Sequence, residues 1–348
     1  MVDSAPPTPR GPIFTVSRAV SALLWVAVIL AILPTIRWLF IDAQVIGTAA
    51  ECRASSGACW AFVLEKLPFL VHGFLVSQVG APQTLFVVLS LVKVALLFAL
   101  PVWGIRILVP IIVIQILTTT VVVAPGLIGL SELSGRWSGL FLTISLMLDG
   151  LPIALALGTL MAVARTSDSP FTRMAVGFFV DACRAIPLVA ILFFAAVVFP
   201  HFLGQELTPS KLVRGWITFV IFAASYFCEA VRGGLVAVGH GQVDGARSLG
   251  LKRWQITLFI RLPQAMTTAW PTITSNLVAF TKDSSLISII GVTELFGALR
   301  FSLSDSEWLG FFLEGYVFVG ALYFALCQLV IGWGRLMERR LARFANVT

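Results

Sequence analysis

The chain has 348 residues, of which 58% are hydrophobic and 12% charged, and its mean hydropathy is +0.97. Soluble domains carry about twice that share of charged residues, so this composition argues against a water-soluble fold. The formal net charge is +7, but Lys and Arg stand at the ends of apolar segments and form no basic stripe. We therefore expect a membrane protein without a nucleic acid partner.

The first segments of the chain are a polar tail and an apolar helix. Residues 1–18 are rich in Pro, Ser and Thr and are predicted to form a cytoplasmic tail. The apolar window that follows, residues 19–40, is longer than the apolar region of a signal peptide, which favours a retained helix. A polar loop then contains Cys52 and Cys59. These two would pair if the loop faces an oxidising compartment, and the sequence leaves that open.

Apolar windows recur along the rest of the chain. A bilayer core about 30 Å thick needs roughly 20 apolar residues per helical span. Windows of this kind cover residues 19–40, 84–100, 106–124, 138–164, 176–200, 213–232, 268–298 and 309–333. We predict an all-α, polytopic membrane protein with about eight transmembrane helices. Lys93 lies inside the second window, where it would be costly if it faced lipid.

The distribution of Lys and Arg predicts the orientation of these windows in the membrane. Lys and Arg are about twice as frequent on one side as on the other, and the positive side stays in the cytoplasm. Both termini are therefore predicted to be cytoplasmic. The chain divides into a tail (1–18), an N-terminal extension (19–136), a core (137–335) and a basic cytoplasmic tail (336–348). We expect about three transmembrane helices and a periplasmic loop in the extension, and about five transmembrane helices in the core.

Residues 232–261 form the longest polar stretch on the cytoplasmic side. Residues 242–249 are compatible with a helix, and Gly250 is placed as its C-terminal stop. Residues 251–260 can form a second short helix before Pro263. We expect a helix, a turn and a helix along the membrane surface.

The residues of this stretch resemble a known family. Asp244, Gly245, Ala246, Gly250, Ile260, Leu262 and Pro263 have the spacing of the cytoplasmic EAA loop of permease subunits in bacterial ATP-binding-cassette importers. Residues 229–234, 241–242, 264–265, 276, 282–286 and 290–291, with 184–188 upstream, resemble the polar amino acid uptake branch. The loop around Cys52 and Cys59 is similar to the longer permease of the general L-amino acid importers of Gram-negative bacteria.

The resemblance implies a type I importer permease core in the bacterial inner membrane, surrounded by lipid. It implies four kinds of partner: a second permease subunit, two ATP-binding subunits, a periplasmic solute-binding protein and an amino acid substrate. It also assigns coupling to the loop 233–262. The coupling residues would be Gly241, Gln242, Asp244, Gly245, Ala246, Gly250, Leu262 and Pro263.

The coupling segment departs from the family pattern, because Glu-Ala-Ala is here Asp244-Gly245-Ala246. Gly costs about 1 kcal/mol relative to Ala inside a helix, so the docking helix is expected to bend more easily or to begin later. The chain has no G-x-x-x-x-G-K-[ST] phosphate loop. We therefore expect no enzymatic activity in this chain and assign ATP hydrolysis to a partner subunit.

Polar residues also fall inside the apolar windows. Lys282 lies nineteen residues after Pro263, roughly 28 Å along a continuous helix. Ionisable residues in such a window are functional candidates, and we hypothesise that Asn276, Lys282, Asp283 and Ser284 lie near the solute path or its gate. The alternative is that Lys282 and Asp283 pair with a neighbouring helix to fix packing. Two further polar pairs allow a functional and a structural interpretation: Asp181 with Arg184, and Glu229 with Arg232 at a helix end.

Two other classes of function are alternatives to the importer. An ion-coupled secondary transporter of small polar solutes also needs many spans and buried polar groups, but it does not need this cytoplasmic loop. A membrane-embedded enzyme needs a nucleophile with a base, or a metal cluster. His72, His201 and His240 are far apart in the sequence, and we predict neither a metal site nor a cofactor.

Overall fold

The computed structural model describes residues 12–74, 81–123, 138–203 and 208–345. Within these ranges the chain is helical, with two isolated β-bridges and no strand. The predicted all-α class is confirmed. The first residues of the predicted N-terminal tail, the last of the C-terminal tail and the end of the extension lie outside the described residues.

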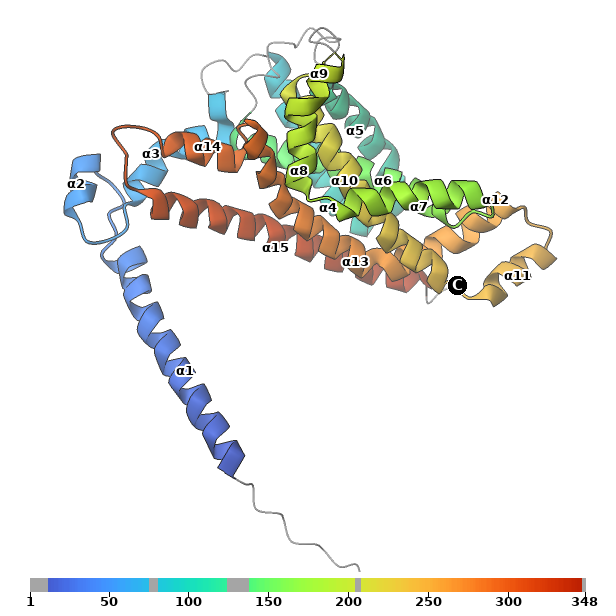
Figure 1. Cartoon of the computed structure of the whole chain (residues 1–348), viewed down its shortest axis with the longest axis horizontal. Helices are drawn as coiled ribbons and strands as arrows, with labels where there is room; N and C mark the ends of the chain where they lie inside the picture. Colours follow the sequence, from blue (N-terminus) through green and yellow to red (C-terminus); the bar gives the residue numbers. More distant parts are fainter. Residues whose placement is uncertain (1–11, 75–80, 124–137, 204–207, 346–348) are drawn as a thin grey trace, which may run out of the picture.

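The N-terminal extension begins with a helix that stands apart from the others. Helix α1 (Pro12–Ile36) starts earlier than expected and ends in a π-helical turn, η1 (Arg37–Ile41). It projects away from the rest of the chain (Figure 1). None of its apolar window over Val20–Ile41 is buried. The other described residues therefore leave the apolar surface of this helix uncovered.

A compact polar loop follows, with two short helices, α2 (Ala49–Ala54) and α3 (Trp60–His72). Thr48 and Glu51 form a capping box at the start of α2, which satisfies two backbone N–H groups that the helix leaves free. Cys52 and Cys59 are joined by a disulfide. The structure thus decides the pairing that the sequence had left open.

This loop packs against the far end of the core. Lys66 on α3 donates to Asp305 at 2.7 Å. Together with the backbone N–H of Glu307, this bond holds the pKa of the Asp305 carboxyl below its usual value. The carboxylate therefore stays ionised as the pH falls toward the ordinary value for Asp, and the link from α3 to the segment before α15 persists with it.

Helices α4 (Ala81–Trp103) and α5 (Leu108–Val123) form a hairpin through the 3₁₀ turn η3 (Gly104–Ile107). Val87–Leu100 and Leu108–Thr120, the apolar parts of these helices among the described residues, correspond to the second and third predicted windows. The hairpin packs against the core helices α6 and α15.

Four long helices form the centre of the core: α6 (Gly139–Arg165), α10 (Lys211–Ala237), α13 (Leu262–Asp283) and α15 (Phe312–Ala345). Helices α6 and α10 cross at Gly158, where an added Cβ would lie 2.6 Å from the carbonyl oxygen of Ala224. Only a residue without a side chain permits this approach. Helix α15 runs on through most of the predicted C-terminal tail as one continuous helix.

Two of the predicted windows are broken rather than straight. Window 176–200 becomes α7 (Pro170–Ala185) and a second helical run, α8 (Leu188–Phe193), η5 (Phe194–Val198) and α9 (Phe199–Leu203). The two runs are bent by 99°. The break falls at Ile186 and Pro187, which fits the bias of a residue before Pro toward extended backbone.

Window 268–298 is divided among α13, the 3₁₀ segment η7 (Ser284–Ile290) and α14 (Leu295–Ser302). Ser284, Ser285 and Ser288 each donate to the carbonyl three residues earlier, which favours the tighter winding of η7. Gly291 then has φ +81° and ends the segment. The side chain of Glu294 accepts the N–H groups of Phe296 and Gly297 and so caps α14.

These breaks explain the number of straight spans. Four described helices are long and apolar enough to cross a membrane: Val20–Ile41, Gly139–Arg165, Lys211–Ala237 and Phe312–Arg343. The bent pair makes a fifth if it counts as one span. The remaining predicted windows are the two helices of the hairpin, whose described apolar parts are 10–17 residues long, and the divided segment around η7.

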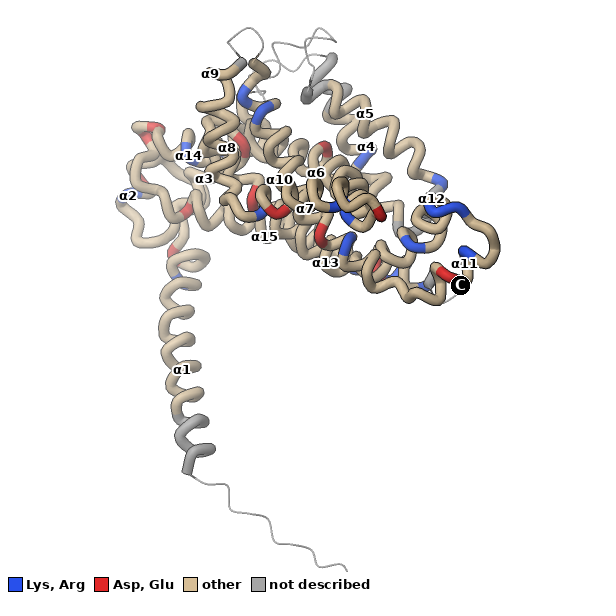
Figure 2. Tube along the Cα trace, turned by 45° about the vertical axis from the view of Figure 1, so that its right-hand side comes forward, with Lys and Arg blue, Asp and Glu red and all other residues tan. Residues whose placement is uncertain are grey.

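The chain has two distinct ends. Helices α2, α3 and α14 lie together at one of them, and α11 (His240–Ser248) and α12 (Arg253–Gln255) lie at the other (Figure 1). Lys and Arg are frequent around α11 and α12 (Figure 2). The chain thus has a strongly basic end opposite the disulfide loop.

Candidate functional site

The basic end carries the polar segment between α10 and α13, which projects from the bundle (Figure 1). Its first helix is α11, where the sequence predicted a helix over residues 242–249. Four of the predicted coupling residues are exposed on it: Gly241, Gln242, Asp244 and Gly245. A Cβ built at Gly241 or Gly245 would meet no atom within 4 Å. This surface of α11 is therefore open to a partner.

Helix α11 ends as the sequence predicted. The Leu251 N–H donates to the Ala246 carbonyl at 3.2 Å, and the Gly250 N–H donates to the Arg247 carbonyl at 2.9 Å. This pair of bonds is the Schellman motif, which needs a left-handed residue just after the helix. Gly250 supplies it with φ +75°. Ala246 is only 6% exposed, so it holds α11 against the segment that follows.

The second half of the segment differs from the separate short helix that was expected. Helix α12 passes into the π-helical segment η6 (Ile256–Arg261), which continues directly into α13. Leu262 and Pro263 thus lie in the first turn of α13, Leu262 half-buried and Pro263 exposed. A proline lacks an N–H and its ring crowds the carbonyl four residues earlier. The π-helical winding before Pro263 is the kind of local adjustment that accommodates such a residue.

Helices α10 and α13, which carry the segment, touch through their backbones. An added Cβ at Gly234 would lie 2.3 Å from the carbonyl oxygen of Ala265. At the neighbouring Gly233 it would meet nothing within 4 Å. The two helices are therefore held together close to the base of the polar segment.

Beside this contact lies a cluster of five charged residues on α6, α7 and α10. Arg165 contacts Glu229 and also donates to both carboxylate oxygens of Asp181, at 3.0 and 3.1 Å. Arg232 donates to Glu229 at 2.9 Å, and Arg184 lies 3.7 Å from the same carboxylate. The pairing of Asp181 with Arg184 that the sequence suggested is replaced by Arg165. Glu229 lies at the centre, where it joins the ends of three helices.

Tyr226 connects this cluster to one of the predicted pathway residues. The Arg184 guanidinium lies 5.3 Å from the centre of the Tyr226 ring. Asn276 donates from Nδ2 to the Tyr226 carbonyl at 3.3 Å. Asn276 is half-buried. The structure thus places Asn276 beside the charged cluster, an association that the sequence does not reveal.

The other predicted pathway residues lie further along the same helix. Helix α13 is continuous past Pro271, so Lys282 lies roughly 28 Å from Pro263. Its side chain is exposed, Asp283 is half-buried, and Ser284 is buried and donates to the Thr281 carbonyl at 2.8 Å. Lys282, Asp283 and Ser284 therefore form a group separate from Asn276, about 9 Å further along the helix.

A second charged pair is buried in the apolar interior. Lys93 on α4 contacts Asp149 on α6, and both side chains are fully buried. Lys93 also donates to Thr118 at 2.9 Å on α5. A buried charge without a partner strongly destabilises a protein, so each of these two charges needs the other. The sequence marked Lys93 as anomalous but could not indicate its partner. The described ranges contain no group of three or more His, Cys, Asp or Glu residues that could hold a metal ion.

Residues 150–343 match a family whose members are described as the binding-protein-dependent transport system inner membrane component. The chain belongs to this family. The match includes the charged cluster, the polar segment and most of α15. The predicted coupling residues of this inner membrane component lie within the matched residues 150–343. The N-terminal extension lies outside them.

Curated relatives of this inner membrane component are amino acid permeases. The chain is 33% identical over 311 residues to the inner membrane amino-acid ABC transporter permease protein YhdY of Escherichia coli K12, covering 88% of this chain and 84% of the relative. It is 32% identical over 212 residues to the glutamate/glutamine/aspartate/asparagine transport system permease protein BztC of Rhodobacter capsulatus. That match covers 60% of this chain and 49% of the relative.

Solved structures agree with the fold. The crystal structure of an amino acid ABC transporter with histidines superposes with a TM-score of 0.52 at 22% identity, over 62% of this chain and 97% of that one. An inward facing structure of the MetNI methionine ABC transporter gives a TM-score of 0.50 at 18% identity, over 58% of this chain and 94% of that one. The predicted type I permease core is thereby confirmed.

Proposed function

We propose that this chain is the membrane-spanning permease subunit of an ATP-driven importer for amino acids. It forms part of the translocation path and couples to ATP-binding subunits through residues 233–262. The observation that carries the proposal is α11, an exposed helix that Gly250 ends and Ala246 anchors, within the family region. The relatives named as amino acid permeases support the substrate class.

The open surface of α11 fits a groove on a separate ATP-binding subunit. The sequence contains no phosphate loop, so we assign ATP hydrolysis to that subunit. Closure of the groove would move α11. Because Ala246 is buried and Gly250 fixes the turn, α11 moves with η6 rather than swinging freely. The close contact of Gly234 with Ala265 then passes the movement to α10 and α13.

We place the basic end in the bacterial cytoplasm, following the retention of positive charge on that side. The end of α15 lies at this side of the chain (Figure 1), and both termini are assigned to the cytoplasm of a multi-pass inner membrane protein. The disulfide of Cys52 and Cys59 suits an oxidising periplasm. The α2–α3 loop is therefore the proposed contact for a periplasmic solute-binding protein.

A second permease subunit completes the solute path in this proposal. Asn276 beside the charged cluster, and the group of Lys282, Asp283 and Ser284, supply polar contacts from this chain. Exposed Lys282 lies in a mostly apolar window, where an unpaired charge that faces lipid is costly. A partner subunit or a water-filled path that faces Lys282 removes that cost.

The test is uptake of labelled amino acids into proteoliposomes that contain this chain and its partner subunits, with and without ATP on the cytoplasmic side. Deletion of residues 242–250 is expected to abolish ATP-dependent uptake. Arg173→Gln, an exposed change on α7 outside residues 233–262, is the control and keeps uptake. Co-purification of all subunits confirms assembly. Uptake that follows an ion gradient and ignores ATP would replace this proposal with a secondary transporter.

A further inference from the structure

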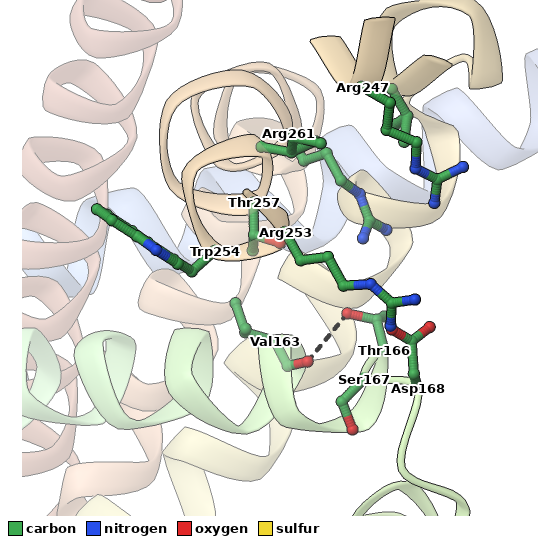
Figure 3. Close-up of a pocket in the computed structure, with 11 residues that line it drawn as sticks. Val163, Thr166, Ser167, Asp168, Arg247, Arg253, Trp254, Thr257 and Arg261 are labelled. Carbon is green, nitrogen blue, oxygen red and sulfur yellow. Dashed lines mark hydrogen bonds and ion pairs between the residues drawn. The ribbon is translucent and has the colours of Figure 1, made fainter. Parts of the chain in front are cut away.

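A cavity of about 210 Å³ lies between the end of α6 and the segment from α11 to η6 (Figure 3). Thr166 and Asp168 line it on one side, and Arg247, Arg253 and Arg261 line it on the other. A single water needs only about 10–15 Å³ of such space. The cavity therefore has room for a polyatomic group.

The cavity carries an excess of positive charge. Figure 3 shows the guanidinium groups of its three arginines directed toward the same space. Arg253 pairs with Asp168, and the two side chains are 80% and 76% exposed. Arg247 pairs with Asp244 at 3.1 Å, again at the surface. Exposed pairs of this kind are weak and exchange readily, so neither carboxylate prevents an anion from binding.

Arg261 has a neutral partner. One of its terminal nitrogens donates to the Leu235 carbonyl at 3.4 Å. Three guanidiniums thus line the cavity with one carboxylate, that of Asp168. Arginine is the side chain best suited to bind phosphate, because its N–H groups match two oxygens at once. The arrangement favours a phosphate group over a neutral ligand.

The apolar neighbours of the cavity indicate where such a phosphate comes from. Trp254, Leu258 and Phe259 lie on the same segment as Arg253 and Arg261, and they are 59%, 48% and 60% exposed. The rings of Trp254 and Phe259 lie 6.1 Å apart. A segment with arginines and exposed aromatic residues is typical of the lipid headgroup level of a membrane. Basic pockets at that level hold anionic headgroups.

We propose that this cavity binds the phosphate of an anionic phospholipid headgroup. A bound headgroup ties the base of the polar segment to the membrane surface, beside the turn at Gly250. A free phosphate ion offers the same charge, but it leaves the exposed Trp254 and Phe259 without an apolar partner. The acyl chains of a phospholipid cover them.

The experiment uses the purified complex of this chain with its partner subunits, freed of lipid in detergent. Native mass spectrometry then counts bound phosphatidylglycerol against phosphatidylcholine. We expect a preference for phosphatidylglycerol that falls about tenfold in Arg253→Gln, the effect of losing one charge-assisted hydrogen bond to the phosphate. Lys252→Gln removes the adjacent exposed charge, which does not line the cavity, and should leave binding unchanged. Asp168→Asn removes a competing carboxylate and should tighten it.

Three results would overturn the assignment. Equal losses in Arg253→Gln and Lys252→Gln would mean that only general surface charge attracts the lipid. A loss in Asp168→Asn that matches Arg253→Gln would mean that the bridge between them is structural. Calorimetry in phosphatidylcholine micelles that detects inorganic phosphate binding, without any preference for phosphatidylglycerol, would assign the cavity to a soluble anion. Lipid binding is measured without transport, so the importer proposal stands or falls separately.

Discussion

Glycine has opposite roles at two adjacent positions of α10. At Gly234 the backbone of α10 meets the Ala265 carbonyl of α13 so closely that an added Cβ would lie 2.3 Å away, whereas Gly233 faces open space. The two positions have the same residue type, the same helix and neighbouring places in the sequence. They therefore form a matched pair, in which packing alone separates the effects of the same substitution.

We expect Gly234→Ala to force α10 and α13 apart and to lower the free energy of unfolding by about 1–3 kcal/mol, as overpacking does in a close-packed interior. Gly233→Ala should be neutral or slightly stabilising, because Ala favours a helix. Thermal unfolding of the purified complex measures both, and uptake measures the coupling. Equal stability of the two variants would contradict the close contact.

At the scale of the element, Gly250 ends α11, whereas Gly245 lies inside it. Gly250 has φ +75°, which closes the Schellman turn. Gly245 lies within the helix with helical backbone and no neighbour within 4 Å of a new Cβ. The first glycine has a conformational requirement. The second glycine lowers helix stability, and no contact within this chain requires a glycine there.

Gly250→Ala is expected to cost about 1–2 kcal/mol, the penalty of a left-handed backbone for a residue with a Cβ, and to reduce the number of amino acids imported per ATP. Gly245→Ala should strengthen α11 by about 1 kcal/mol and keep that ratio. Uptake and ATP hydrolysis measured together in proteoliposomes give the ratio. A larger loss in Gly245→Ala would show that the partner's groove requires a bare backbone there.

At the scale of the whole molecule, the extension and the core share one buried charge pair. Lys93 on α4 and Asp149 on α6 meet where neither is exposed, and Gln115 and Thr118 on α5 complete the network. Removing one partner leaves a charge without compensation, whereas replacing both by apolar residues does not. The pair therefore fixes where the hairpin lies on the core.

Lys93→Met is expected to lower stability by about 3–5 kcal/mol, and the double variant Lys93→Met with Asp149→Leu should recover most of that loss. The measurement is a double-mutant cycle by thermal unfolding in detergent. Additive losses would mean that the two side chains do not interact.

The parts of the structure that depend on neighbours in the sequence were predictable. A helix before Gly250 and a stop at it follow from local backbone preference. The partner of Lys93 was not predictable, because Asp149 is 56 residues away on another apolar helix and nothing local marks the contact. Asp181 pairs with Arg165 instead of Arg184 for the same reason: the meeting of α6 with α7 decides it. The helix continues through Pro263 because the preceding residues are π-helical, and no residue pattern predicts that winding.

Helix α15 has 34 residues, roughly 51 Å in length, and exceeds the bilayer core of about 30 Å. Val319 belongs to the hydrophobic cluster around α3 and α14, and Met337 belongs to the larger cluster around α6, α10 and α13. Helix α15 is thus one continuous helix packed into both clusters. Because such a helix is stiff along its length, we expect a displacement of one cluster to shift α15 at the other.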